Sequence, residues 1–125
     1  MRLADDGRSS PRWRAILEAR WRIRLQEVTE LSVAYHATAA DAPGGMEDRR
    51  ARRLLGQAVA ARRRLADTED ALDRLSAGGY GRCEQCSAPI HEALLAAAPE
   101  CRYCARCATA APADAVAAGG AAGRR

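Results

Sequence analysis

The chain has 125 residues and a formal net charge of +4, in which every cationic side chain is an arginine because lysine is absent. Aromatic residues make up 4% of the sequence, and much of its 48% apolar content is alanine, which argues against a large globular core. No apolar run approaches the roughly 18 residues that a membrane span needs, and the polar N-terminus carries no secretory signal. We therefore expect a small cytoplasmic protein whose cysteines stay reduced.

The first strong pattern is helical. Residues 1–9 are polar and are expected to be a flexible N-terminus. Ser10 and Pro11 then supply an N-cap and a proline at the first helical position. Apolar residues follow at steps of three and four, which predicts a helix from Pro11 to about Ala37 with one continuous apolar stripe. The stripe consists of Trp13, Leu17, Trp21, Leu25, Val28, Leu31 and Tyr35.

A turn and a second helix come next. Pro43, Gly44 and Gly45 interrupt the helical pattern, which places a tip at about residues 38–48. The second pattern begins near Met46 and ends at the glycine pair 78–79, a typical C-cap. Its heptad-like seam contains Ala51, Leu54, Ala58, Ala61, Leu65, Thr68, Leu72 and Leu75. The sequence therefore predicts a mainly α fold with a long antiparallel coiled-coil hairpin over residues 10–78, although the two seams could also pair between chains.

Charged residues support pairing within one chain. With a turn near residue 42, residue i lies opposite roughly residue 84 − i of the hairpin. Arginines early in the first helix then face an acidic cluster, and Glu27 and Glu30 face a basic stretch. The acidic cluster is Asp67, Glu69, Asp70 and Asp73; the basic stretch contains Arg52, Arg53 and Arg62. Much of the arginine content is thereby explained without a nucleic-acid partner.

All five cysteines lie between residues 79 and 107. Two C-x-x-C pairs, Cys83/Cys86 and Cys104/Cys107, are separated by seventeen residues, a spacing typical of a structural zinc site. Cys101 and Cys104 form an overlapping C-x-x-C, so the second pair is ambiguous from spacing alone. His91 is a further candidate ligand, and two disulfides would require an oxidising compartment.

Four thiolates leave no open position on the metal, so the site is expected to be structural rather than catalytic. We predict a four-cysteine zinc finger over residues 79–108 that includes a short helix within Ile90–Ala98. Residues 109–125 are rich in alanine and glycine and are expected to be mostly disordered, with a turn of helix after Cys107 as an alternative for their start.

The run from Ala71 to Cys107 resembles the zinc-finger region of the DksA/TraR family of bacterial transcription regulators. The matching features are Ala71, Leu72, Leu75, the Gly79-Tyr80-Gly81 turn, Cys83, Cys86, Ile90, Leu95, Ala97, Pro99, Cys104 and Cys107. Family members also resemble the predicted architecture, a long coiled coil with a globular zinc finger. The resemblance implies that Zn²⁺ is held by Cys83, Cys86, Cys104 and Cys107 and that Cys101 is not a ligand.

The same resemblance implies a protein that binds RNA polymerase rather than DNA, with the hairpin tip in the secondary channel. Asp41, Glu47 and Asp48 are the tip acids that would act there, although the D-x-x-D-x-A pattern of longer members is absent. Acids at the start of the second helix also favour the helix dipole, which is the simpler explanation of Glu47 and Asp48. Ser87 replaces the usual glycine and Leu94 the common arginine, so dependence on the alarmone ppGpp is not carried over.

The leading hypothesis is a zinc-binding regulator of transcription initiation that binds RNA polymerase. The alternatives are a zinc-stapled module for another protein partner, or a nucleic-acid binder that uses the arginine-rich hairpin. An enzyme is not expected, because a closed metal site and two isolated histidines, His36 and His91, provide no catalytic constellation.

Overall fold

The computed structural model describes residues 11–41 and 45–110, with side chains for residues 11–40 and 48–109. The predictions for residues 1–9 and 111–125 lie outside this part. The chain divides into two compact units, Met1–Tyr80 and Gly81–Arg125, so the boundary falls two residues after the end expected for the hairpin. The described residues form four helices and no strand, and none of these helices is long and apolar enough to cross a membrane.

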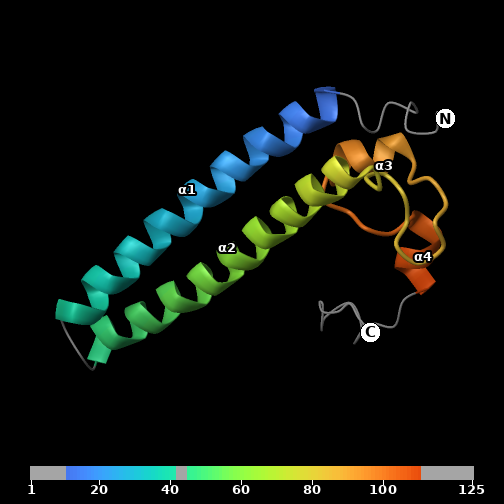
Figure 1. Cartoon of the computed structure of the whole chain (residues 1–125). Coiled ribbons are helices and arrows are strands. Elements are labelled where there is room, and N and C mark those ends of the chain that lie inside the picture. The colour runs from blue at the N-terminus through green and yellow to red at the C-terminus, as the bar shows by residue number, and fades with distance from the viewer. Residues whose placement is uncertain (1–10, 42–44, 111–125) are drawn as a thin grey trace. The chain divides into compact units, whose positions relative to one another are not determined.

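The first unit is an antiparallel pair of long helices, as predicted (Figure 1). Helix α1 spans Pro11–Asp41 and helix α2 spans Gly45–Ala77. Helix α1 continues four residues past the expected Ala37, because no helix-breaking residue precedes Pro43 and a proline restricts mainly the residue before it. With 31 residues, α1 is about 46 Å long. The mainly α hairpin architecture is therefore confirmed.

The helices meet along a seam in which alanine predominates on α2. The buried residues of α1 include Trp13, Leu17 and Val28, whereas Trp21, Leu31 and Tyr35 are half-buried. On α2 the fully buried positions are Ala51, Ala58, Ala61, Thr68, Ala71 and Leu75. Small side chains on α2 let the larger side chains of α1 come close to its backbone. Leu54, Leu65 and Leu72 are half-buried at the margin of this seam.

Leu25 does not belong to the buried stripe, contrary to the prediction. Its side chain is 39% exposed, while Arg24 is half-buried beside it. The reason is geometric: each step of four residues overshoots a full helical turn by about 40°. Three such steps from Trp13 carry position 25 out of the interface, and position 24 takes its place. A guanidinium thus interrupts the apolar seam in the middle of α1.

The predicted pairing register also needs correction. Trp21 Nε1 donates a hydrogen bond to Glu69 Oε2 at 3.1 Å, and Arg64 Nη2 donates to Glu27 Oε2 at 2.8 Å. The residue numbers of the two partners add up to about 90 in each pair, whereas the predicted register has a sum of 84. Side chains slant toward the N-terminus of their own helix, which in an antiparallel pair brings together residues further along each chain. The turn also lies slightly later than expected.

Helix α2 ends in a Schellman motif. The Gly79 N–H donates to the Arg74 carbonyl at 2.8 Å, and the Gly78 N–H donates to the Leu75 carbonyl at 3.2 Å. Gly78 has φ = +90°, a backbone conformation that costs a residue with a Cβ atom free energy. The chain then leads to Tyr80, which is buried with its ring centroid 5.9 Å from that of Trp13. An aromatic pair therefore joins the start of α1 to the residues after α2.

The second unit is built mostly from turns. An isolated antiparallel bridge joins Arg82 to Pro89, and the Ile90 N–H donates to the Gly81 carbonyl at 2.7 Å, so the chain folds back on itself. Helix α3 spans Glu92–Ala97, inside the range expected for a short helix, and contains the buried Leu95. Helix α4 spans Ala105–Ala110 and begins directly after Cys104.

Candidate metal centre

The first C-x-x-C pair lies in a tight turn before the fold-back. The Gln85 N–H points to Cys83 Sγ at 3.4 Å, and the Ser87 N–H donates to the Cys83 carbonyl at 2.9 Å. Ser87 completes this turn with φ = +66°, the left-handed region that glycine adopts most easily. Backbone geometry thus favours the glycine that the resemblance leads one to expect at this position, and serine adopts the same conformation at a cost.

The second pair lies at the start of α4. Cys104 precedes the first helical residue and is therefore in the N-cap position, where a side-chain acceptor satisfies a free backbone N–H. Cys107 follows in the first turn of the helix. The two pairs are linked by the Glu84 N–H, which donates to the Arg102 carbonyl at 2.8 Å, and by an ion pair between their side chains at 3.5 Å. The sequence pattern gave no sign of this link.

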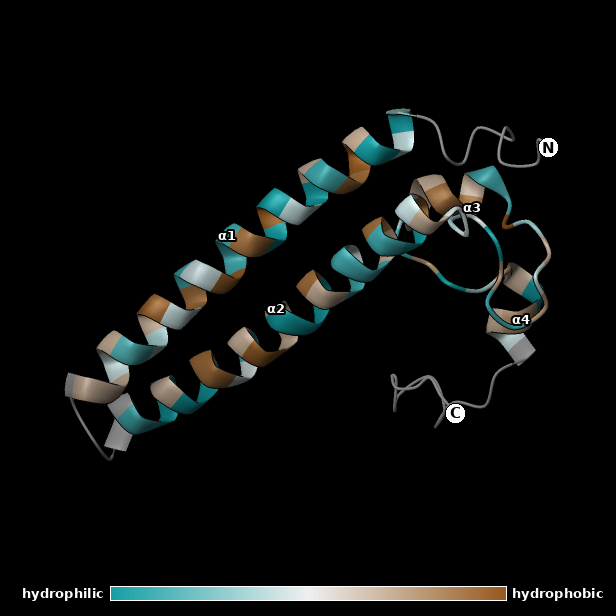
Figure 2. Ribbon diagram, viewed as in Figure 1, coloured by the Kyte–Doolittle hydropathy of each residue, from teal (hydrophilic) through white to brown (hydrophobic). Residues whose placement is uncertain are grey.

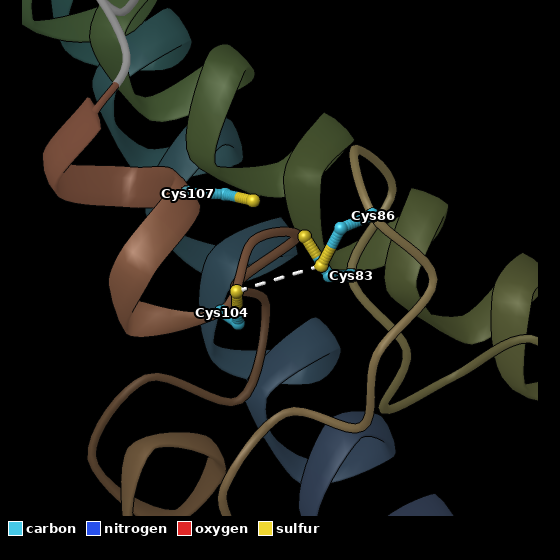
Figure 3. Close-up of side chains that lie close together, drawn as sticks. All are labelled: Cys83, Cys86, Cys104 and Cys107. Carbon is cyan, nitrogen blue, oxygen red and sulfur yellow. Dashed lines mark hydrogen bonds between the residues drawn. The ribbon is translucent and has the colours of Figure 1, made fainter.

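The four sulfur atoms converge on one point (Figure 3). The Sγ atoms of Cys83, Cys86, Cys104 and Cys107 all lie within 4.8 Å of one another. A tetrahedral ion with metal–sulfur bonds of about 2.3 Å requires sulfur separations of about 3.8 Å. The separation between Cys86 Sγ and Cys104 Sγ is 3.8 Å. The four side chains therefore fit a single tetrahedral metal ion.

The acidities of the thiols differ within this cluster. Burial raises the pKa of Cys83, but hydrogen bonds from the backbone of Cys104, Cys86 and Gln85 outweigh it and lower the pKa to about 6. The backbone N–H of Cys107 lowers the pKa of Cys104. Burial and the three neighbouring sulfur atoms raise the pKa of Cys107 to about 12. Successive ionisation thus becomes harder, and a bound cation would offset the accumulated negative charge.

The other candidate ligands lie outside the cluster. Cys101 is half-buried, and its backbone N–H donates to the Ala98 carbonyl at 3.0 Å. His91 is exposed, and its carbonyl accepts the N–H groups of Leu94 and Leu95 at the start of α3. Among the described residues, the geometry brings together the two pairs Cys83/Cys86 and Cys104/Cys107.

The acids of the hairpin tip are only partly described. The side chains of Asp41 and Glu47 lie outside the described residues. The carboxylate of Asp48 forms an ion pair with Arg52, one turn further along α2, and the Asp48 side chain is 41% exposed. An acid paired within the first turn of its helix agrees with the simpler explanation, stabilisation of the helix start. A role of these three acids in binding a partner stays a prediction.

The described residues thus define a helical hairpin followed by a four-cysteine cluster that could hold a metal ion, and a solved structure has a similar fold. The chain is similar to the structure of transcription factor DksA2 from Pseudomonas aeruginosa, with a TM-score of 0.78 and 16% sequence identity. The similarity covers 86% of this chain and 85% of that one. The resemblance to DksA/TraR proteins is therefore confirmed at the level of the fold.

Similarity in sequence covers a smaller part of the chain than similarity in fold. No family model matches the chain. One stretch of 44 residues is 46% identical to an uncharacterized protein from Aquifex aeolicus (strain VF5). This stretch is 35% of the present chain and only 30% of the length of that protein. The likeness to DksA2 is thus a likeness of the fold.

Proposed function

We propose that this chain is a zinc-binding transcription regulator that binds RNA polymerase through the tip of its hairpin. The observation that carries the proposal is the combination of a hairpin fold shared with the transcription factor DksA2 and a four-thiolate cluster. The polymerase, the secondary channel and the modulation of initiation are inferred from this likeness. A protein that acts there would work in the cytoplasm.

The proposed ion is Zn²⁺, held by Cys83, Cys86, Cys104 and Cys107. Four thiolates in tetrahedral geometry are typical of zinc, which would supply folding free energy and no reaction chemistry here. The chain's own residues prepare the site: backbone N–H groups favour the thiolates of Cys83 and Cys104 before a metal binds. We expect no enzymatic activity, because four protein ligands leave no position for a substrate.

Binding to purified RNA polymerase tests the proposal directly. We expect the zinc-loaded protein to bind and the combined variant Asp41→Ala, Glu47→Ala, Asp48→Ala to lose its effect on transcription initiation. Asp73→Ala is a matched control, because Asp73 is an exposed acid on the same helix and far along it from the tip. No binding by the unmodified protein would refute the proposal. If the unmodified protein, the combined variant and Asp73→Ala all bind the polymerase and are equally active, the tip acids have no role, but the proposed binding stands.

A further inference from the structure

The side of α2 that faces away from α1 carries an ordered pattern. We call the exposed residues Arg49, Arg52, Arg53, Leu55, Gly56, Val59, Ala60, Arg62 and Arg63 the α2 flank. They fall into two adjacent rows with steps of three and four residues, which together form one strip along the helix. One row is Arg49, Arg53, Gly56, Ala60 and Arg63, and the other is Arg52, Leu55, Val59 and Arg62. The strip lies opposite or beside the buried positions Ala51, Ala58 and Ala61. Figure 2 shows apolar segments between hydrophilic ones along this helix.

The centre of the α2 flank is apolar and unusually flat. Leu55 and Val59 are 44% and 43% exposed, and Gly56 and Ala60 lie beside them with almost no side chain. A Cβ atom added to Gly56 would meet nothing within 4 Å, so no contact in the described part of the chain requires glycine there. Glycine inside a helix costs about 1 kcal/mol relative to alanine. What glycine provides at an exposed position is close access to the backbone.

Arginines bound the apolar centre on both sides. Arg49 and Arg53 precede it and Arg62 and Arg63 follow it, and all four are exposed. Elsewhere in the described residues arginines do have acidic partners, such as Arg64 with Glu27 and Arg74 with Asp70. The ion pairs within the described part of the chain leave Arg49, Arg53, Arg62 and Arg63 without an acidic partner. An apolar centre with an arginine rim is typical of protein interfaces.

A second copy of this chain does not fit the α2 flank. A twofold contact that places Leu55 against Val59 of the other copy also places Arg52 against Arg62, and because Asp48 already pairs with Arg52 no acid is supplied to Arg62. A parallel twofold arrangement places each arginine against the same arginine of the other copy. Like charges that face each other across an interface oppose association by several kcal/mol. The complementary surface must therefore carry acidic residues at both ends.

We propose that the α2 flank binds a helix of another protein, with an apolar stripe at its centre and acidic residues near both ends. Small residues at the contact let two helix axes approach closely, and Gly56 and Ala60 provide such a position. Arg49 and Arg63 are separated by about 21 Å along the helix, which sets the spacing of the acids on the partner. The proposed site runs along the side of the hairpin and goes beyond the proposed polymerase function, and it borders the tip at Arg52, which pairs with Asp48.

A designed peptide tests this inference. The probe is a fluorescently labelled helical peptide of about 22 residues, with a leucine and alanine stripe and glutamates at both ends about 21 Å apart. Its anisotropy is measured with the zinc-loaded full chain at two salt concentrations. We expect binding that weakens with salt, and no binding of a peptide with lysines in place of the glutamates.

Two variants separate the contributions of shape and charge. Gly56→Leu should weaken peptide binding about tenfold or more by blocking close approach, although leucine is a better helix former than glycine. Arg62→Glu with Arg63→Glu should weaken it to a similar extent. Ala37→Leu, a similar enlargement at an exposed position of α1, is the control and should leave binding unchanged.

Three results would overturn the inference. The acidic peptide does not bind the unmodified chain, or Gly56→Leu binds it as well as the unmodified chain does. The third is salt-sensitive binding of a DNA duplex of similar length that Gly56→Leu leaves unchanged while the peptide fails to bind. That result would assign the arginines to phosphate groups instead.

Discussion

The same substitution at Gly56 inside α2 and at Gly78 just after its end should change the free energy of unfolding in opposite directions. Neither glycine is packed: a Cβ atom at Gly56 or at Gly78 would meet nothing within 4 Å. The two positions differ only in backbone conformation, since Gly56 is inside the helix and Gly78 has φ = +90°. Any difference between Gly56→Ala and Gly78→Ala therefore measures local backbone preference without a contribution from packing against other segments.

The expected magnitudes follow from that difference. At Gly56, alanine should stabilise the hairpin by about 0.8–1 kcal/mol, the helix-propensity difference. At Gly78, the left-handed conformation costs alanine roughly 1–2 kcal/mol, and the reduced entropy of the unfolded chain offsets about 0.4–1 kcal/mol of this cost. Gly78→Ala should therefore destabilise the hairpin by up to about 1.6 kcal/mol, with a central value of about 0.8 kcal/mol.

Urea unfolding followed by tryptophan fluorescence is a suitable assay, because both tryptophans lie in α1 and report on the hairpin unit. Zinc is kept saturating so that the metal centre is the same in all samples. We expect the urea midpoint to rise for Gly56→Ala and to fall for Gly78→Ala. A rise for both variants would refute the assignment of Gly78 to a left-handed helix cap.

Three further predictions concern strain, the polar seam and the metal. Ser87→Gly should stabilise the second unit by about 0.5–1 kcal/mol, because glycine adopts the left-handed backbone conformation without the cost that serine has there. The measurement is the rate at which zinc is released to a chromophoric chelator in guanidinium, which should be slower in the variant. An unchanged rate would contradict the strain at Ser87. Glu27→Gln should lower the free energy of unfolding by about 0.5–1.5 kcal/mol, and by less when Arg64 is also changed to glutamine. Urea unfolding of the single and double variants measures both effects. Metal affinity should fall at least about tenfold per pH unit on acidification, because binding displaces at least the proton of Cys107 (pKa about 12). The fall should be steeper below pH 6, where Cys83 (pKa about 6) also binds a proton. Chelator competition from pH 8 to 5.5 measures this, and a flat profile would contradict it.

The hairpin could be predicted from the sequence because helix signals are local. Pro11, Pro43 and Gly78 mark its limits by restricting their own backbone or that of a neighbour, and the apolar steps between them indicate helix wherever it packs. The seam was harder to predict. Whether Leu25 or Arg24 turns inward depends on accumulated rotation along α1, and the partner of Glu27 depends on how far two long side chains slant.

The metal centre also has features that the sequence predicts and features that it does not. Two C-x-x-C pairs at this spacing indicate four thiolate ligands because each pair needs only a local turn. The choice between Cys101 and Cys107 could not be made from spacing, since both lie three residues from Cys104. It depends on where α4 begins, which places Cys107 in the first turn of the helix with its sulfur near Cys83. The φ angle of Ser87 follows from the path of the chain after the first pair and has no sequence signal apart from the usual glycine.

Zinc content after single cysteine changes tests most directly that one ion is held by four of the five thiols. The full chain is purified with zinc, dialysed against a moderate chelator and analysed for metal per chain, with Cys101→Ser and Cys107→Ser in parallel. We predict one zinc per chain in the unmodified protein and in Cys101→Ser, and loss of zinc in Cys107→Ser. Loss in Cys101→Ser with retention in Cys107→Ser would contradict the ligand set.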